Sequence, residues 1–522
     1  MPSRLLTALL FLGCSFPALA EDWPQFGRDK TRNAVSPEKN PPTWWQYPEK
    51  EDGKIIPGKN IRWVSDLDNP YQICGDPIIV DGLVWVGVQH TDWRTEETPN
   101  RKEDEHFSAL YCLDEKTGKT LYRRLCPTQR GYWENGAWWH SHTSVPLIEG
   151  DTLWVVMNNS EVVCMDIGPL KKRTGLPKDK WVLDMRKELG IVPRYCLHFG
   201  RRCSIAGHKD WIYVITGTGH TFDKDRETAA ARAPSLVCLE KASGKVVWRD
   251  DTPGKDIRMG QFASPTVIEV KGQTQVIAPQ GDGWVRSFDA ATGKLLWKFD
   301  TNPHDVPDEP GGLARNRERH ELPSTAVFHD GRLYIGNGSV YDSPDPTSAW
   351  LYCIDPSKTG DISPEFTSGP DKGKPNPNSG MVWRYGGLDN SVKPDNKEKW
   401  RPEIFHGTVS NVAIDKGFLL ATDVAGDVHC LDAKTGRRHW KHETTSEING
   451  SPLIVDDKVY VGSFEEVWVF DLAKEKRATT QIKGEPVVCS PVFANGVLYV
   501  AAGHHLYAIS GNEKQPKKEL QP

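Results

Sequence analysis

The chain has 522 residues, of which 38% are hydrophobic and 26% are charged, and its formal net charge is −5 at neutral pH. Its 46 Gly, 38 Pro and 20 Trp are typical of a turn-rich all-β protein and disfavour a helical one. Basic and acidic residues are interleaved without a Lys/Arg cluster, so we expect no nucleic-acid partner.

The first twenty residues have the parts of a secretory signal peptide in the usual order. Arg4 precedes an apolar run, and the small-residue sequence Ala-Leu-Ala ends at Ala20, after which we expect cleavage. A lipoprotein cut at Cys14 is the weaker alternative, because Phe11 and Leu12 stand where a Leu and a small residue are usual. No later apolar run approaches the roughly 18 residues that span a bilayer. We therefore expect a periplasmic or secreted protein without a transmembrane segment.

A Pro-rich arm at residues 21–59 comes next, and one pattern then recurs eight times up to residue 511. Each unit has a Ser-Pro-like start, a short apolar run, a Gly or Asp turn and a second apolar run that ends near Gly, as in "SPLIVDDKVYVG" (451–462). Four units also contain a ten-residue segment such as "FDAATGKLLW" (288–297). The units start near residues 76, 144, 203, 264, 324, 410, 451 and 490. Self-similarity at such long periods is the signature of a repeat architecture.

Each unit is predicted to form four short strands joined by tight turns, because its runs are rich in β-branched and aromatic residues. In the segment at 288–297, Gly293 can take the positive φ that closes a hairpin, and Asp289 can hydrogen-bond the following backbone. Trp297 then falls in the fourth strand, where a large indole can pack against the neighbouring unit. A four-stranded sheet cannot bury both faces alone, so we expect an all-β, eight-bladed β-propeller of four-stranded antiparallel blades.

The ring is predicted to close through the N-terminus. The eighth unit has three strands before the polar tail at 512–522, and "NIRWVSDL" (60–67) looks like an unclaimed fourth strand. An N-terminal strand that completes the last blade leaves no open edge, so we expect one closed domain over 60–511. The Pro-, Gly- and charge-rich insertion at 356–402 need not pack into the core.

These repeats resemble those of the pyrroloquinoline-quinone (PQQ)-type β-propeller family, on the evidence of segments of the form xDxxTGKxxW that follow SPxxxDGxVYVG. The opening "DWPQFGRD" (22–29) also resembles the Trp-Pro-x-Phe leader of secreted bacterial members. The family includes quinoprotein alcohol dehydrogenases and a non-enzymatic outer-membrane assembly lipoprotein. The resemblance covers about residues 60–511 and implies the fold more strongly than any activity.

Residues that recur in every blade are expected to build the blade, so specificity must lie in residues that do not recur. This interpretation makes turn supports of seven acids that share one position: Asp114, Asp166, Glu240, Asp289, Asp355, Asp432 and Asp471. It makes buried packing residues of five cysteines that share a place in the third strand: Cys112, Cys164, Cys238, Cys353 and Cys430. No spaced pair of Cys-x-x-Cys motifs occurs, and we assign no metal ligands.

The irregular residues gather just before the first strand of each unit, in loops that ring one mouth of the channel if the order is that of the family. The candidate ligand-binding residues there are Trp138, Trp139, His140, His142, His198, Arg201, Arg202, Gln261, His320, Glu321 and His406. Indoles beside His and Arg suit a planar or anionic ligand. The alternative, which we favour, is a polar lining of a water-filled funnel.

Quinoprotein alcohol dehydrogenases typically carry adjacent cysteines against the PQQ ring, and this chain has no Cys-Cys pair. Calcium ligands and a catalytic Asp of that kind could not be matched to residues here, so no catalytic residue is assigned. We therefore expect a non-catalytic binding or scaffold module, monomeric, with an unidentified protein or small-molecule ligand at the channel mouth. The alternative hypothesis is a dehydrogenase that uses PQQ and Ca to oxidise an alcohol or sugar.

Overall fold

The computed structural model describes residues 21–47, 49–51, 54–56, 58–67, 72–73, 75–90, 107–127, 144–192, 203–219, 232–257, 260–302, 320–338, 349–387, 404–444, 446–464, 466–481 and 485–511. Short strands dominate these residues. The helical elements α1 (Gly168–Lys171), α2 (Met185–Leu189) and η1 (Gly254–Asp256) are each about one turn long. No helix in the described ranges is long and apolar enough to cross a membrane.

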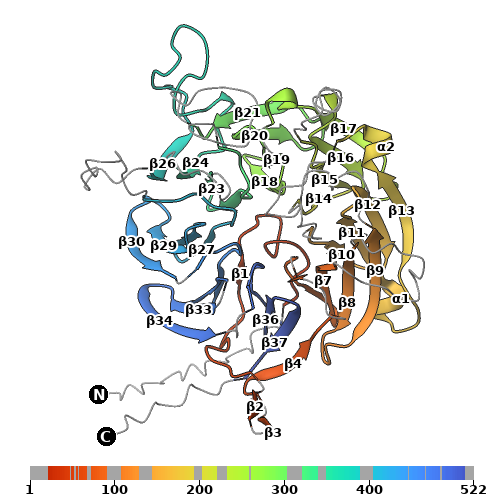
Figure 1. The fold of residues 1–522 in the computed structure, drawn as a ribbon. Helices are drawn as coiled ribbons and strands as arrows, with labels where there is room; N and C mark the ends of the chain where they lie inside the picture. Colours follow the sequence, from red (N-terminus) through yellow and green to blue (C-terminus); the bar gives the residue numbers. More distant parts are fainter. Residues whose placement is uncertain are drawn as a thin grey trace, which may run out of the picture.

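Eight of the nine sheets in the described residues stand around a central channel as the blades of a propeller (Figure 1), and the ninth is a two-stranded sheet outside the ring. Blade 1 contains β6 (Ile78–Val80), β7 (Leu83–His90), β8 (Phe107–Asp114) and β9 (Thr120–Pro127). Blade 2 contains β10 (Leu147–Glu149), β11 (Thr152–Val156), β12 (Glu161–Asp166) and β13 (Lys178–Asp184). Blade 3 contains β14 (Ala206–His208), β15 (Trp211–Ile215), β16 (Leu236–Glu240) and β17 (Val246–Asp250), and blade 4 contains β18 (Thr266–Val270), β19 (Gln273–Pro279), β20 (Trp284–Asp289) and β21 (Leu295–Asp300).

Blade 5 contains β22 (Val327–His329), β23 (Arg332–Gly336), β24 (Trp350–Ile354) and β26 (Met381–Gly386). Blade 6 contains β27 (Ala413–Asp415), β28 (Phe418–Thr422), β29 (Asp427–Asp432) and β30 (Arg438–Glu443). Blade 7 contains β31 (Leu453–Val455), β32 (Lys458–Gly462), β33 (Glu466–Asp471) and β34 (Lys474–Gln481), and blade 8 contains β35 (Val492–Ala494), β36 (Val497–Ala502), β37 (His505–Ile509) and β4 (Ile61–Ser65). The short strands β1 (Val35–Ser36), β2 (Glu49–Glu51), β3 (Lys54–Ile56), β5 (Gln72–Ile73) and β25 (Gly360–Asp361) lie outside this scheme. The predicted eight-bladed all-β propeller is confirmed.

The predicted ring closure is also confirmed. Strand β4 pairs antiparallel with β37, with Trp63 opposite Ala508 and Ser65 opposite Leu506. The last blade is therefore built from the two ends of the repeat region, and its outer strand comes from the N-terminal side. A closure of this kind leaves no edge strand exposed at the join.

The first strand of each blade, which we call the inner strand, lines the channel, and the other three follow outward (Figure 1). Because every blade has this order, all inner strands start at one mouth of the channel and end at the other. The loop mouth is the end formed by the loops that precede the inner strands and by the turns between second and third strands. The arm mouth is the opposite end, formed by the turns that follow inner and third strands.

The repeated Gly and Trp residues contact each other across neighbouring blades. Gly293 has a φ of 71°, as the turn requires, and a Cβ at this position would lie 2.7 Å from the indole of Trp248 in the preceding blade. The Nε1 of Trp248 also donates to the carbonyl oxygen of Ala290 at 3.0 Å. The pairs Trp63 with Gly118, Trp181 with Gly244, and Trp383 with Gly436 repeat the contact between indole and glycine. The Gly of one unit and the Trp of the unit before it thus form a single packing device.

The recurring acids and cysteines have structural roles. Asp289 accepts hydrogen bonds from the backbone N–H of Ala291 and from both the N–H and the hydroxyl of Thr292, as the turn interpretation predicted. The five shared cysteines are buried free thiols. Burial raises the pKa of the Cys238 thiol to about 12, which makes it unreactive at neutral pH.

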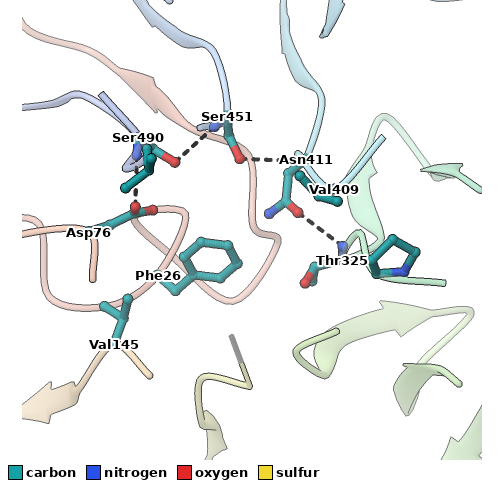
Figure 2. Close-up of a pocket in the computed structure, with 10 residues that line it drawn as sticks. Phe26, Asp76, Val145, Thr325, Val409, Asn411, Ser451 and Ser490 are labelled. Carbon is teal, nitrogen blue, oxygen red and sulfur yellow. Dashed lines mark hydrogen bonds between the residues drawn. The ribbon is translucent and has the colours of Figure 1, made fainter. Parts of the chain in front are cut away.

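The Ser-Pro-like starts of the units form a hydrogen-bonded ring inside the channel, which we call the inner ring. In each link, a backbone N–H of one blade donates to a side-chain oxygen of the next blade. The links run from Val145 to Ser204, Ser204 to Ser264, Ser264 to Thr325, Thr325 to Asn411, Asn411 to Ser451, Ser451 to Ser490 and Ser490 to Asp76, with distances of 2.8–3.0 Å. Figure 2 shows four of these links. Val145 has no side-chain acceptor, and the ring is interrupted there.

The first part of the Pro-rich arm, residues 21–40, lies in the arm mouth and contacts all eight blades (Figure 1). From here on, the arm means these residues. Strand β1 adds in parallel to the inner strand β31, with Val35 opposite Ile454. The contacts are Trp23 with Ile79, Pro24 with Ile148, Arg32 with Ile205, Lys30 with Val267, Thr31 with Phe328, Asn33 with Ile414, Ala34 with Ile454, and Glu38 with Asn495, in blades 1 to 8 respectively. The arm therefore closes this mouth of the channel with the chain's own backbone.

Arg32 is the centre of the arm and is fully buried. Its guanidinium donates to the carbonyl oxygens of Pro265, Ile205 and Phe26 at 2.9–3.1 Å. Burial lowers the pKa of Arg32 to about 10. Gly27, with a φ of 67°, packs so closely on the Arg32 backbone that an added Cβ would lie 2.7 Å away. The leader motif "DWPQFGRD" is thus accounted for by packing inside the channel.

Part of the insertion at residues 356–402, which the sequence indicated need not pack into the core, docks on the edge of a blade. Strand β25 pairs in parallel with the outer strand β21, with Gly360 opposite Trp297. Ile362 is completely buried behind this pair. The apolar Ile362 thus packs this otherwise polar segment against the outer edge of blade 4.

Candidate functional site

The loop mouth holds the candidate residues that the structure describes. Gln261, His320 with Glu321, and His406 lie in the loops that precede the inner strands of blades 4, 5 and 6. The other seven candidates lie outside the described residues: Trp138, Trp139, His140, His142, His198, Arg201 and Arg202. The described part of the site therefore consists of three consecutive blades.

Gln261 is 2% exposed, and neither atom of its side-chain amide has a hydrogen-bond partner within the described ranges. A buried amide without a partner costs about 1–3 kcal/mol. A water molecule or a polar ligand atom usually supplies the missing hydrogen bond to such a group. Within the described ranges, Gln261 thus has both a donor and an acceptor available for a polar atom at the loop mouth.

His320 is held by its own blade and its neighbour. Its backbone N–H donates to Asn302 Oδ1 at 2.6 Å, and Asn302 Nδ2 donates to its carbonyl oxygen at 3.0 Å. The side chains of His320 and Glu321 are both buried. This double hydrogen bond holds the backbone of the loop at His320.

His406 belongs to a buried network in blade 6. Its Nδ1 lies 3.1 Å from Asp423 Oδ2, and the same oxygen lies 3.1 Å from Nε2 of His429. The Nδ1 of His429 lies 3.1 Å from the hydroxyl of Tyr385. Burial would raise the pKa of Asp423, but the hydrogen bonds from His406 and His429 outweigh this and hold the pKa well below its ordinary value. Asp423 is therefore a buried carboxylate that orients two imidazoles.

A second acid joins this network. Asp427 Oδ2 lies 3.6 Å from Nδ1 of His406 and 2.6 Å from Nζ of Lys441. Burial, together with the nearby charge of Asp423, raises the pKa of Asp427. The negative charge of Asp427 is thus paired with the ammonium of Lys441, and Asp423 is hydrogen-bonded by the two imidazoles.

The third-strand histidine of this network is not repeated in the other units that have a shared cysteine. His429 precedes the shared cysteine Cys430, whereas Tyr352 precedes Cys353 and Val163 precedes Cys164 at the same place. Sequence reasoning identified His406 and missed Asp423, Asp427 and His429, because these lie on the second turn and third strand and not in the preceding loop. Comparing the residue before each shared cysteine would have revealed His429.

Glu485 was also missed. It lies five residues before Ser490 of the inner ring, as His406 lies five before Asn411 and His320 five before Thr325. Its side chain contacts His505 and lies near His504, in the turn between β36 and β37. A count back from the inner ring finds the same loop position in blades 5, 6 and 8.

A small cavity lies in the channel between the loop mouth and the arm. Phe26 of the arm and residues of the inner ring line this cavity, whose volume is about 20 Å³, the space of a single water molecule (Figure 2). Asp76 and Asn411 are among its polar lining residues. The cavity therefore suits a water molecule and not a larger ligand.

PQQ carries three carboxylates, so its pocket needs cationic partners. Within the described ranges, Arg286 forms an ion pair with Asp282 at 2.7 Å and Lys441 with Asp427 at 2.6 Å. Other charged side chains described in the loops of this mouth are mixed in sign, since Glu321, Glu447 and Glu485 are acidic and Lys255 is basic. The described part of the mouth therefore shows no cluster of cations that would fit this cofactor, and no reaction step is derived through it.

Comparison with known proteins agrees with this architecture. The family model described as outer membrane protein assembly factor BamB matches residues 181–340 and 376–479, just over half of the chain. The chain belongs to this PQQ-type β-propeller repeat family. Among solved structures, BamB from Moraxella catarrhalis aligns over 86% of this chain and 99% of its own, with a TM-score of 0.51 and 12% identity, which shows the shared fold.

Curated relatives of the PQQ-type family align over shorter stretches. Quinohemoprotein alcohol dehydrogenase ADH IIB of Pseudomonas putida is 27% identical over 220 residues, which are 40% of this chain and 27% of the relative. The dehydrogenase subunit of a quinone alcohol dehydrogenase from Gluconacetobacter polyoxogenes is 30% identical over 131 residues, 22% of this chain and 17% of its own length. The alignments thus span about a quarter or less of these relatives.

Proposed function

We propose that the protein is an extracytoplasmic, non-catalytic binding or scaffold module that holds a partner protein or small molecule at its loop mouth. The observation that supports this most is the arm. Residues 21–40 fill the opposite mouth and contact all eight blades. Because the arm occupies the opposite mouth, the loop mouth is the end of the channel at which we propose that a ligand binds.

The residues of the loop mouth support binding better than catalysis. Asp423 is hydrogen-bonded by two imidazoles, and Lys441 is paired with Asp427. These acid–base groups neutralise each other inside the protein. The described mouth also supplies a buried amide, Gln261, which suits recognition of a polar group. Groups that are rigid, mutually satisfied and different in each blade are typical of a recognition surface.

The second candidate is a PQQ- and calcium-dependent dehydrogenase, which the relatives named as quinone alcohol dehydrogenases favour. Against it stand the absence of a Cys-Cys pair in the sequence and the pairing of the described cations Arg286 and Lys441 with acids at the mouth. The two functions are separated by mixing the purified protein with PQQ and Ca²⁺. Bound quinone absorbance, a melting shift and dye reduction with an alcohol panel would overturn the non-catalytic proposal.

The binding proposal is tested with the mature protein as bait in envelope extracts. We expect the wild type to capture a partner that His406→Ala and Gln261→Ala do not retain. Lys39→Ala, which alters a surface ion pair with Asp456 at the arm mouth, serves as the matched control and should retain it. Loss in the control as well, or equal capture by all variants, would contradict the loop mouth as the docking site. Fractionation and N-terminal sequencing test export and the cut after Ala20.

A further inference from the structure

Blade 8 holds a cluster of two histidines and one carboxylate that the proposed function does not use. Glu485 lies in the loop before β35, His504 in the turn after β36, and His505 begins β37. Glu485 Oε1 lies 2.8 Å from Nδ1 of His505 and 3.9 Å from Nε2 of His504. One ligand atom of each side chain lies within 4.8 Å of the others. The three side chains are 20–38% exposed, so solvent reaches them.

We propose that Glu485, His504 and His505 bind a divalent transition-metal ion of the zinc class. Two imidazoles and one carboxylate form a donor set that proteins use for Zn²⁺ when one coordination position stays open to solvent. Imidazole nitrogen also favours Zn²⁺, Ni²⁺ and Cu²⁺ over the hard cations Ca²⁺ and Mg²⁺. Bonds of about 2.0–2.1 Å at tetrahedral angles separate donor atoms by about 3.3–3.4 Å. The observed distances of 2.8 and 3.9 Å lie on either side of that value.

The carboxylate is held in place by its surroundings. The hydroxyl of Tyr507 donates to Glu485 Oε2 at 3.3 Å, and the ring of Tyr47 packs edge-on against Tyr507 with centroids 4.7 Å apart. Gly503 faces Glu485 so closely that an added Cβ would lie 3.2 Å from its side chain. Hydrogen bonds to the oxygen that does not ligate are the usual support of a metal-binding carboxylate.

The network of His406, Asp423 and Asp427 has similar residue types but is already complete. Asp423 is hydrogen-bonded by the backbone N–H groups of His406, Ala425 and Asp427 as well as by two imidazoles. Lys441 neutralises Asp427. In contrast, within the described residues Glu485 has no Lys or Arg in an ion pair, and its side-chain partners are the two imidazoles and the hydroxyl of Tyr507. A metal ion would supply a positive charge beside this carboxylate.

A bound ion would also strengthen the closure of the ring. It would join the loop before β35 to the start of β37, the strand that pairs with β4. Because an ion that binds only the folded state stabilises it by mass action, metal should raise the melting temperature. The cluster lies at the loop mouth, but the inference does not require a bound partner, so metal uptake is measured on the purified protein alone.

The test uses the full mature chain without a polyhistidine tag. Equilibrium dialysis against Zn²⁺ should give one ion per chain, and Co²⁺ should give visible d–d absorption bands that Zn²⁺ removes. Glu485→Gln, which keeps the side-chain shape, and His504→Ala should each lose stoichiometric uptake. Tyr507→Phe should weaken binding about tenfold through the outer hydrogen bond alone. His439→Ala, an exposed histidine in blade 6 outside any such cluster, should bind as the wild type does.

The melting temperature should rise with Zn²⁺ in the wild type and in His439→Ala, and should not respond in Glu485→Gln. Uptake of less than one ion per chain by the folded wild type, or equal uptake by wild type and Glu485→Gln, would overturn the proposal. His505→Ala alters the start of β37 and is read only if its circular dichroism is native. The isosteric Glu485→Gln and the turn variant His504→Ala keep the test decisive if it is not.

Discussion

The two mouths of the channel are built from the same eight blades in opposite ways. At the arm mouth, one segment of the chain makes backbone contacts to the same region of the inner strands, as Trp23 does with Ile79 and Lys30 with Val267. At the loop mouth, each blade presents a different residue before its inner strand, such as His320 in blade 5 and His406 in blade 6. Contacts that repeat from blade to blade pack the arm at the arm mouth, and residues that differ between blades are available for binding at the loop mouth.

The difference also separates two kinds of buried charge. Arg32 at the arm mouth is surrounded by backbone carbonyl oxygens, whereas Asp423 at the loop mouth is surrounded by titratable side chains. The first arrangement depends only on the course of the chain, so any repeat with this course could provide it. The second depends on particular side chains in one blade. Substitutions at the arm mouth should therefore change stability, and substitutions at the loop mouth should change binding.

The largest expected effect is that of Arg32→Met. The substitution removes the donors from the carbonyls of Pro265, Ile205 and Phe26 and leaves these groups buried in the channel. We expect the free energy of unfolding to fall by about 3–5 kcal/mol, since each such group costs about 1–3 kcal/mol. Urea unfolding followed by tryptophan fluorescence measures the change.

Arg28→Met is the matched control, because Arg28 also belongs to the arm but forms a partly exposed ion pair with Glu21. Its effect should stay below about 1 kcal/mol. Equal losses in the two variants would show that the arm acts only through its general charge, and the proposed distinction between the mouths would lose its basis.

A second, smaller effect is expected for Gly293→Ala. Both Gly293 and Gly331 have positive φ, so alanine costs about 1 kcal/mol of backbone strain at either position. At Gly293 the new Cβ also meets the indole of Trp248, whereas at Gly331 nothing lies within 4 Å. We expect Gly293→Ala to lose about 1–3 kcal/mol more than Gly331→Ala in thermal unfolding. Similar losses would mean that the contact between blades contributes nothing beyond turn geometry.

The fold could be predicted because its signals are local and repeated. A turn needs a residue with positive φ, so Gly293 and its counterparts stand out in the sequence. The strand around Trp63 was recognisable as the missing partner of the last blade, and it pairs where expected. The path of the arm could not be predicted, because its contacts are mostly backbone hydrogen bonds, which leave little trace in side-chain patterns.

The candidate site was predictable only in part, for a related reason. His406 was found because it departs from the repeat in a loop, where irregular residues are visible. Asp423 and His429 occupy positions that read as ordinary turn and strand residues until the blade is folded around them. Their proximity to His406 depends on the pairing of β28 with β29, which brings residues from separate segments together.

His406→Ala should sharpen the contrast between the mouths. His406 is partly exposed, and Asp423 keeps three backbone N–H donors when the imidazole is lost. We expect a stability loss of about 1 kcal/mol, the size of a single hydrogen bond, together with loss of partner capture. Chemical denaturation and the pull-down assay are run on the same preparation. A loss of several kcal/mol would place His406 among the structural residues and not among those that bind.

The smallest effect concerns the recurring turn acids on the arm side, for which Asp432 is a suitable example. The side chain and backbone of Thr435 donate to Asp432 Oδ1 at 2.6 and 2.8 Å and lower its pKa below the ordinary 3.8. Because the folded pKa is the lower one, the stabilisation is present above about pH 4 and is lost as the pH falls through the folded value.

Asp432→Asn can still cap the turn but does not titrate. It should cost less than about 1 kcal/mol at pH 7, as expected for a solvent-screened group. Its deficit relative to the wild type should disappear between pH 5 and about pH 2 in urea titrations. A deficit that stays constant over that range would show that the acid supports the turn by shape alone.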